Sequence, residues 1–320
     1  MEPIRWKAQK AIDAHVHYRD KEPIPHFQKI LKSVNYDSIC ILGGHDREKL
    51  KYKTILPGKT YIFGMLDQKA DKIQAGDGRY LVDQLEALLD IGYDGIKMMD
   101  GKPAMRRTWQ PLPLDHSYFH PYFKCAEELD VPITLHAVDP IDYWNPDRPD
   151  SYANLGTQEE FFRQAIAVME RNPNLRINFA HFLFMGPHLK RLAGLFDRFP
   201  KMHVDMAMGQ EYLYYMSDDP DASRDFCVKY SSRILYGTDI SDHNSLNHGW
   251  SKAETLRLFL ETDETFDNLI FWGMNRAPEA GSNGRVKLRG LQLPQDALDN
   301  IMWRNFERFA GAKPKPAPQS

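Results

Sequence analysis

The stretch Ala-Ile-Asp-Ala-His-Val-His, residues 11–17, is a short apolar run that ends in two histidines one residue apart. In a β-strand, side chains at i and i+2 point to the same face, so His15 and His17 would aim at one point, as a metal site requires. The chain has 12 histidines among 320 residues, and by composition arithmetic one such pair arises by chance with an expectation of about one half. The pair therefore gains meaning only from further ligands at the ends of other strands.

Seven more β-type runs follow along the chain, and helical patterns with apolar residues three and four apart separate most of them. The eight strand candidates are residues 11–17, 37–43, 60–66, 95–99, 132–136, 176–181, 203–206 and 233–239. The main helix candidates are residues 25–34, 80–91, 118–129, 158–171, 188–199 and 253–261. Alternation of this kind indicates a parallel sheet with helical crossovers, and eight rounds of it predict an α/β fold of the (β/α)8 TIM-barrel type.

Three segments depart from the simple alternation. Residues 46–56, between the second and third strands, are charged and only loosely helical, which predicts one irregular βα unit. Residues 138–154 and 210–222 both follow strands and are too long for simple turns, so we expect them to form active-site loops.

The end of the chain has its own pattern. Residues 294–311 are expected to form a helix that closes the barrel. No interdomain linker interrupts the alternation, so we expect one barrel domain over residues 1–311. The Pro- and Lys-containing residues 312–320 are expected to be a disordered tail.

The composition is typical of a soluble globular protein, with 42% hydrophobic and 27% charged residues. The net charge is −3 and no basic block occurs, which argues against binding to nucleic acid or to an anionic membrane. A small-molecule substrate is therefore the expected partner. The three cysteines, Cys40, Cys125 and Cys227, are far apart and odd in number, which argues against a disulfide framework. A reducing, cytoplasmic setting is the expected location.

Polar residues suited to metal binding or acid–base chemistry close several of the predicted strands. They are His15 and His17 on the first strand, Lys97 on the fourth, His136 on the fifth, His181 on the sixth and Asp239 on the eighth. In a (β/α)8 barrel the C-terminal ends of the strands form one face, and that face carries the active site. These residues are therefore predicted to converge on one pocket.

Taken in order, these strand ends resemble the amidohydrolase superfamily, specifically its amidohydrolase-related branch, over essentially the whole chain. The resemblance rests on Asp-Ala-His-Val-His at 13–17, Tyr-Asp-Gly-Ile-Lys at 93–97, Ala-Glu-Glu-Leu-Asp-Val-Pro-Ile-Thr-Leu-His at 126–136, Asn-Phe-Ala-His at 178–181, Tyr-Gly-Thr-Asp at 236–239 and Asn-Phe-Glu-Arg-Phe-Ala-Gly at 305–311. These motifs are specific for the superfamily and the branch, and not for the substrate.

The resemblance implies that one divalent metal ion is bound, most often zinc, with an open position for water. The implied ligands are His15, His17, His136 and Asp239. A bound cation lowers the pKa of its water to roughly 7, which makes hydroxide available at neutral pH. His181 would contact that water or the substrate, and either Asp239 or His181 would take the remaining proton as the catalytic group. The nitrogen and carboxylate ligands also suit iron or manganese, and zinc is the expected ion.

Lys97 leaves a second form of the metal site open. In some members of the superfamily a carboxylated lysine on the fourth strand bridges two metals, and Lys97 is placed to do the same. In the related branch, a Gly-x-Lys sequence at this point usually accompanies a single metal. The lysine then meets an anionic group of the substrate or an internal acid. We expect the mononuclear form, with a binuclear site and a carboxylated Lys97 as the alternative.

Arg19 is a candidate for substrate binding. The pattern His15-x-His17-x-Arg19 resembles the motif of cyclic amidases such as dihydroorotase, in which the arginine holds a substrate carboxylate by bidentate hydrogen bonds. A solvated loop arginine paired with Asp20 is the competing interpretation of the same residues.

Three further residues are weaker candidates for substrate binding. His45 follows the second strand and lies on the face that carries the site, although a loop histidine without a role fits equally well. Tyr143 and Trp144 belong to the predicted 138–154 loop. Aromatic residues there could line a pocket for a ring-shaped substrate, and equally often they hold a long loop against the rim of a barrel.

The resemblance predicts a metal-dependent hydrolase that cleaves a C–O or C–N bond of an ester, lactone or amide in a small carboxylated substrate. A nonoxidative decarboxylase or hydratase of an aromatic or unsaturated carboxylic acid is the alternative, because the branch contains such enzymes. Aromatic-acid decarboxylases of this kind often have glutamate in place of the first histidine, so His15 favours hydrolysis. A non-catalytic barrel that binds metal or ligand is a third hypothesis, and the intact ligand set counts against it. Barrels of this branch are commonly dimers, so a homodimer is compatible with the resemblance.

Overall fold

Nine parallel strands form one sheet in the computed structural model, which describes residues 2–108, 112–208, 210–270 and 286–316. The order in the sheet is β8-β7-β6-β5-β4-β3-β2-β1-β9, so almost every strand lies beside the next one in the chain. The strands are β1 (Ile12–His17), β2 (Ser38–Leu42), β3 (Thr60–Met65), β4 (Gly95–Met98), β5 (Ile133–Leu135), β6 (Ile177–Phe179), β7 (Met202–Asp205), β8 (Ile234–Leu235) and β9 (Ile240–Ser241). Every predicted strand is therefore present.

The sheet closes because β8 and β9 are two parts of one short stretch of chain, residues 234–241. β8 pairs with β7, and β9 pairs with β1. Between these two segments the N–H of Ala14 donates to the carbonyl of Tyr236 (2.9 Å), and the N–H of Asp239 donates to the carbonyl of His15 (2.8 Å). The chain thus passes from β7 to β1 across this stretch, and the predicted (β/α)8 TIM barrel is confirmed.

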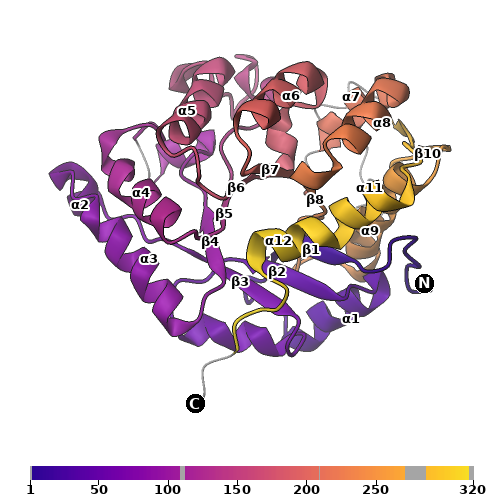
Figure 1. The fold of residues 1–320 in the computed structure, drawn as a ribbon, viewed down its shortest axis with the longest axis horizontal. Coiled ribbons are helices and arrows are strands. Elements are labelled where there is room, and N and C mark those ends of the chain that lie inside the picture. Colours follow the sequence, from indigo (N-terminus) through magenta and orange to yellow (C-terminus); the bar gives the residue numbers. More distant parts are fainter. Residues whose placement is uncertain (1, 109–111, 209, 271–285, 317–320) are drawn as a thin grey trace.

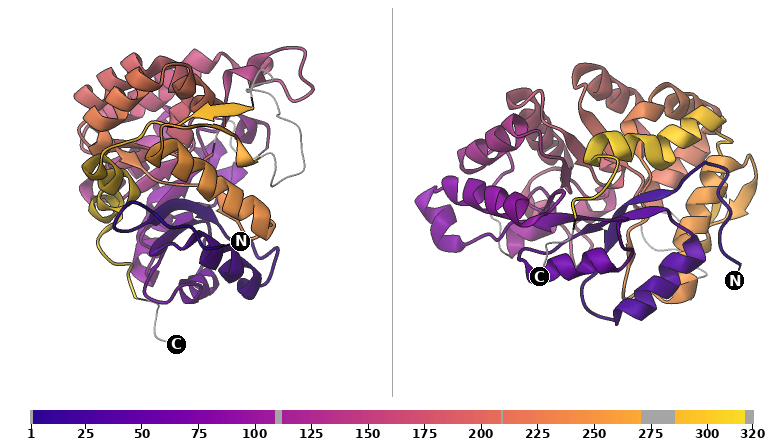
Figure 2. Two further views of the ribbon diagram at one scale, coloured as in Figure 1. Left: turned by 90° about the vertical axis from the view of Figure 1, so that its right-hand side faces the viewer. Right: turned by 60° about the horizontal axis from the view of Figure 1, so that its bottom comes forward.

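Helices surround the strands on the outside of the barrel (Figures 1 and 2). They include α1 (Ile24–Val34), α2 (Ala70–Ala75), α3 (Arg79–Ile91), α4 (His120–Glu128), α5 (Gln158–Arg171), α6 (Leu189–Arg198) and α9 (Leu246–Glu261). The start of α5 follows from local sequence, because Thr157 and Glu160 form a reciprocal capping box. None of the helices in the described residues is long and apolar enough to span a membrane.

The connection between β2 and β3 is irregular, as the sequence predicts. It contains the 3-10 helix η1 (Glu48–Thr54) in place of a regular α-helix. The predicted loop over residues 138–154 is also present, with only short 3-10 turns at Ile141–Trp144 and Ala153–Leu155.

The expectation of a second long loop, at residues 210–222, is wrong. This segment forms α7 (Gln210–Asp218) and the beginning of α8 (Pro220–Lys229). The side chain of Asp219 accepts a hydrogen bond from the N–H of Ala222, and Pro220 occupies the first turn, which together start α8. Tyr212 is fully buried against the ring of Phe182, so apolar packing decides the conformation of α7.

The C-terminal helical segment closes the N-terminal end of the barrel, as predicted for residues 294–311 (Figure 1). It comprises α11 (Gln295–Asp299), one π-helical turn (Asn300–Arg304) and α12 (Asn305–Ala310). Asn305 Nδ2 donates to the carbonyl of Ile234 (2.7 Å), the first residue of β8. Phe306 packs edge-on against Tyr61 of β3. The C-terminal segment therefore does not cover the opposite end of the barrel, where the strands end.

A two-stranded antiparallel ribbon and the following tail complete the described chain. The ribbon pairs β10 (Thr265–Asp267) with β11 (Lys287–Arg289). In the segment expected to be disordered, the N–H of Lys315 donates to Asp94 Oδ1 (2.6 Å). Residues 317–320 of that segment lie outside the described residues.

Candidate metal centre and active site

A cavity of about 420 Å³ lies at the C-terminal ends of the strands. Most of the predicted site residues line it together. They are His15, His17, Arg19, His45, Lys97, His136, His181 and Asp239. The residues at the predicted strand ends thus lie together in one cavity, as expected for a barrel of this type.

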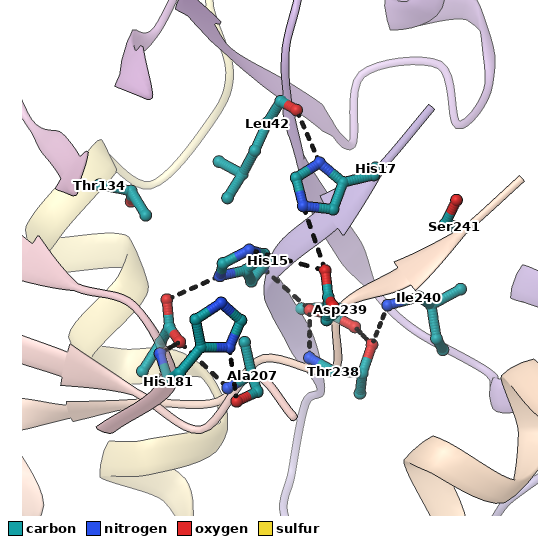
Figure 3. A network of polar contacts seen from close by, with 12 residues as sticks. His15, His17, Leu42, Thr134, His181, Ala207, Thr238, Asp239, Ile240 and Ser241 are labelled. Atoms are coloured by element: carbon teal, nitrogen blue, oxygen red, sulfur yellow. Dashed lines mark hydrogen bonds and ion pairs between the residues drawn. The ribbon is translucent and has the colours of Figure 1, made fainter. Parts of the chain in front are cut away.

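The imidazoles of His15 and His17 are both directed at the carboxylate of Asp239 (Figure 3). His17 Nε2 lies 3.1 Å and His15 Nε2 lies 3.8 Å from Asp239 Oδ1. One potential ligand atom from each of the three residues lies within 4.8 Å of the others. Alternation along β1 places both histidines on the inner face, as the i, i+2 spacing predicts.

Hydrogen bonds at the far side of each ring determine which nitrogen carries the hydrogen. His17 Nδ1 lies 2.9 Å from the carbonyl oxygen of Leu42, which only accepts, so Nδ1 donates. His15 Nδ1 lies 2.9 Å from Asp205 Oδ2 and donates to this carboxylate. In the neutral form of either ring, Nε2 then has a lone pair and no hydrogen. Both lone pairs face the Asp239 carboxylate, which is also an acceptor.

Three acceptor atoms turned toward one another are suited to a cation. His15 Nε2 is buried and has no hydrogen-bond partner among the described residues. Burial, followed by the charge of Lys97, lowers the pKa of His15 to about 4, so the ring is neutral and its lone pair is available at pH 7. Although burial acts to raise it, the pKa of Asp239 is held well below its usual range by Lys252 and the two histidines. This donor set fits a divalent metal ion such as zinc.

Asp239 and His181 both have left-handed backbone conformations. Their φ angles are each +57°, which is rare for residues other than glycine and costs about 1–2 kcal/mol per residue. His181 begins the turn η6 (His181–Phe184), in which all four residues have positive φ. Burial of Phe182 and Leu183 within the core offsets this strain. Strained backbone of this kind is typical of functional sites.

His181 presents a free nitrogen to the cavity. Its Nδ1 donates to the carbonyl of Ala207 at 3.2 Å, so Nε2 has the lone pair (Figure 3). The ring centroid of His181 lies 5.1 Å from that of His15 and 4.7 Å from that of His136. Burial, followed by repulsion from the neighbouring histidines, lowers the pKa of His181 well below its ordinary value. His181 is thus a neutral acceptor beside the three-residue group.

His136 lines the cavity, but the structure does not place it in the group of three. Its Nε2 donates to Asp139 Oδ1 at 2.8 Å, and Asp139 also accepts from the hydroxyl of Tyr152. The carboxylate three residues further along the chain therefore holds Nε2, and Nδ1 is the nitrogen that has a free lone pair. Burial lowers the pKa of His136 to about 4, so this ring too is neutral.

Lys97 lies at the inner wall of the cavity with its side chain almost fully buried. Within the described part of the chain no carboxylate pairs with its ammonium group, and burial lowers its pKa to about 8. Arg19 is exposed at the mouth of the cavity and likewise has no ion-pair partner among the described residues. The predicted alternative partner of Arg19, Asp20, instead binds Lys49 at 2.6 Å. Two unpaired cations thus face the cavity and suit an anionic substrate.

Of the three weaker candidates, His45 lines the rim of the cavity and is 62% exposed. Tyr143 and Trp144 are not among the residues that line this cavity, and their contacts match the alternative in which they hold the loop. Tyr143 stacks on Tyr152 (5.1 Å between ring centroids), and Trp144 Nε1 donates to the carbonyl of Gly156 (2.7 Å). Tyr143 thus binds within the 138–154 loop, whereas Trp144 joins this loop to Gly156 and to Phe161 of α5.

Two buried carboxyl groups of the site were not among the predicted residues. Asp205 is the last residue of β7 and contacts His15. Its position at the C-terminal end of a strand is the signal that predicts the other site residues, and it applies to Asp205 as well. Asp13 accepts from the N–H groups of His15 (3.0 Å) and Thr238 (3.1 Å) and so joins β1 to the residue before Asp239. Burial raises the pKa of Asp13 to about 7.

Comparisons with known proteins agree with this architecture. Residues 75–310 match the family model described as amidohydrolase. No curated protein sequence matches the chain. Among solved structures, an uncharacterized TIM-barrel protein from Bordetella bronchiseptica has 13% identity and a TM-score of 0.58, with 94% of this chain and 98% of that chain covered.

Several of the similar structures are named as decarboxylases. The 5-carboxyvanillate decarboxylase LigW from Sphingomonas paucimobilis has 13% identity and a TM-score of 0.52, with 95% of this chain and 99% of that chain covered. A dihydroxybenzoic acid decarboxylase from Polaromonas, solved with bound manganese and 2-nitroresorcinol, has 12% identity and a TM-score of 0.51, with 97% of each chain covered. At these identities the likeness supports the fold.

Proposed function

The chain belongs to the amidohydrolase family, and on that premise we propose that it is a metal-dependent hydrolase of a small carboxylated ester, lactone or amide. The observation that carries this proposal is the cluster of acceptor atoms from His15, His17 and Asp239. A divalent cation, with zinc as the proposed ion, supplies Lewis-acid polarisation of a carbonyl group and acidifies water. One ion per chain is proposed, because one such cluster is present among the described residues.

The protein's own groups supply the proton transfers. Hydrolysis releases a proton from the attacking water, and either the Asp239 carboxylate or Nε2 of His181 accepts it. His181 is suited to this because Ala207 fixes its Nδ1–H and leaves Nε2 free. The same group then returns the proton to the leaving oxygen or nitrogen.

Lys97 and Arg19 are proposed to bind the carboxylate of the substrate. Lys97 lies deep in the cavity, whereas Arg19 lies at its mouth. Asp242 holds the Arg19 loop in place, since it accepts from the N–H groups of Arg19 (3.1 Å) and Lys21 (2.7 Å). A buried cation without a carboxylate partner in the protein binds a substrate anion more strongly than an exposed one does, because little water competes for the anion there.

Decarboxylation is the second candidate function. Two of the solved structures with the same fold are named as decarboxylases of aromatic acids, and one of them holds manganese. The buried ammonium group of Lys97 beside the proposed metal site suits a substrate carboxylate that is itself the reacting group.

The test is a substrate panel with two readouts. Protein loaded with zinc or with manganese is incubated with carboxylated esters, lactones, amides and aromatic acids, and acid release and carbon dioxide release are both measured. Acid release that is abolished in His17→Ala supports hydrolysis, and carbon dioxide release in its place supports the second function. Metal-loaded protein that turns over none of these classes would overturn both in favour of a non-catalytic barrel.

A pair of loop variants tests the substrate class. Arg19→Ala is expected to raise the Michaelis constant for a carboxylated substrate by about 10- to 100-fold, the range of one charged hydrogen-bonded contact. Lys21→Ala, on the same loop but outside the cavity lining, is the matched control. Equal effects of the two variants would remove the role of Arg19.

A further inference from the structure

Asp205 is a carboxylate beside the site that accepts four hydrogen bonds. Its side chain is fully buried at the end of β7. Oδ2 accepts from His15 Nδ1 (2.9 Å) and from Asn178 Nδ2 (2.8 Å). Oδ1 accepts from the N–H groups of His181 (2.9 Å) and Ala207 (3.0 Å). Four donors saturate the two oxygens, so this group acts purely as an acceptor.

The bond to His15 determines what that ring offers to the cavity. Because the Asp205 oxygen accepts, the hydrogen of the neutral ring sits on Nδ1 and the lone pair on Nε2. Nε2 is the atom that lies 3.8 Å from Asp239 Oδ1 and has no partner among the described residues. A donor in place of Asp205 would reverse the tautomer and point an N–H at Asp239.

The other oxygen of Asp205 acts on the left-handed turn. It binds the backbone N–H of His181, where four consecutive residues with positive φ begin. It also binds the N–H of Ala207, whose carbonyl receives Nδ1–H of His181. Asp205 thus holds both the start of the turn and the backbone that orients the His181 ring.

We propose that Asp205 is a positioning residue that sets the tautomer of His15 and the placement of His181 through its two oxygens. The role in metal affinity rests on the proposed function, whereas the tautomer of His15 does not. Mutation of such an outer partner of a metal ligand typically weakens metal binding by about 10- to 100-fold.

The decisive variant is Asp205→Asn, which preserves the shape of the side chain. The two backbone N–H groups hold the amide oxygen at the Oδ1 position, so the NH2 group faces His15 Nδ1. Asn178 is able to rotate to accept from it, because its Oδ1 has no partner among the described residues. The hydrogen of His15 is then expected to move to Nε2.

The measurement is nitrogen-15 NMR of histidine-labelled protein without metal, with the His15 signal assigned through His15→Gln. We expect the Nδ1–H tautomer in the original protein and the Nε2–H tautomer in Asp205→Asn. Equilibrium dialysis with Zn²⁺ should show affinity about 10- to 100-fold weaker in the variant. Asp100→Asn, a buried carboxyl after β4 that lies outside the cavity lining, is expected to change neither readout.

Three outcomes overturn the proposal. They are an Nε2–H tautomer of His15 in the original protein, an unchanged tautomer in a folded Asp205→Asn, and an equal loss of Zn²⁺ affinity in Asp100→Asn. The first measurement needs no variant, so it decides the question even where Asp205→Asn fails to fold. A tautomer switch in a protein that hydrolyses no substrate supports the role of Asp205 and counts against the proposed function.

Discussion

Nε2 of His17 lies 3.1 Å from Oδ1 of Asp239, although both atoms are acceptors in the neutral histidine and the ionised carboxylate. The carbonyl of Leu42 fixes the hydrogen of His17 on Nδ1, on the far side of the ring. Two lone pairs this close repel each other unless a proton or a cation lies between them. The barrel holds them together because β1 and β9 are neighbours in the sheet.

Removal of metal is the first test of that relationship. A chelator is expected to abolish turnover, and Zn²⁺ or Mn²⁺ is expected to restore it. Because metal binds the folded state, a free concentration of about 100 times Kd should add about 2.7 kcal/mol of stability and raise the Tm. Calorimetry with and without metal measures this shift. His17→Ala should lose the shift, and a Tm that metal leaves unchanged in the original protein would contradict the site.

Lys97→Met tests the buried cation of the cavity. Loss of a charged hydrogen bond to the substrate should raise the Michaelis constant for a carboxylated substrate by about 10- to 100-fold. Metal content, measured by mass spectrometry, is expected to stay at one ion per chain. A fall from two ions to one would instead show the binuclear site. Lys29→Met, an exposed residue of α1, is the control.

His203 predicts a component of the pH dependence of stability. Burial lowers its pKa to about 3. In the unfolded chain His203 takes up a proton near pH 6.5, whereas the folded protein does so only near pH 3. The free energy of unfolding is therefore unaffected by His203 above pH 6.5 and falls by up to about 1.4 kcal/mol per pH unit between pH 6.5 and pH 3. His203→Asn should therefore show a shallower loss of stability between about pH 6 and pH 4 in urea unfolding.

The control for this pH prediction is His188→Asn, because His188 is exposed at the start of α6. It is expected to leave the slope of stability against pH unchanged. Identical slopes for the original protein and for His203→Asn would refute the prediction.

Asp94 tests whether the C-terminal segment contributes to stability. Asp94 Oδ2 lies 2.8 Å from Lys53 Nζ in a buried ion pair, and both groups also bind the backbone of Lys315. Asp94→Ala leaves a buried ammonium group unpaired and should cost about 3–5 kcal/mol in urea unfolding.

Deletion of residues 312–320 isolates the part of this network that the tail supplies. Among the described residues it removes the two hydrogen bonds to this ion pair and a third from Lys315 Nζ to the carbonyl of Leu89, and it should cost about 1–3 kcal/mol. Asp90→Ala, an exposed residue of α3, is expected to have almost no effect. A deletion as neutral as Asp90→Ala would show that Lys315 is not held by Asp94 in solution.

The sequence by itself determined the barrel and the polar residues at its active face. Apolar residues that recur every second residue or about every 3.6 residues are a local pattern, so the eight strands and most helices could be predicted from short stretches of sequence. The same alternation placed His15, His17, His181 and Asp239 at strand ends. The segment at 210–222 was missed because tertiary burial of Tyr212 selects the helix there, and length alone had suggested a loop.

Only the tertiary structure decided how those residues are held. His15 and Asp205 are 190 residues apart in sequence, and their contact exists because closure of the barrel brings the ends of β1 and β7 together. Which nitrogen of each histidine faces the cavity likewise depends on partners such as Leu42 and Asp139, and no spacing encodes such partners. Short-range patterns in the sequence show which residue types stand at the strand ends. The direction of each hydrogen bond depends on distances between residues far apart in the chain, and only the folded barrel fixes those distances.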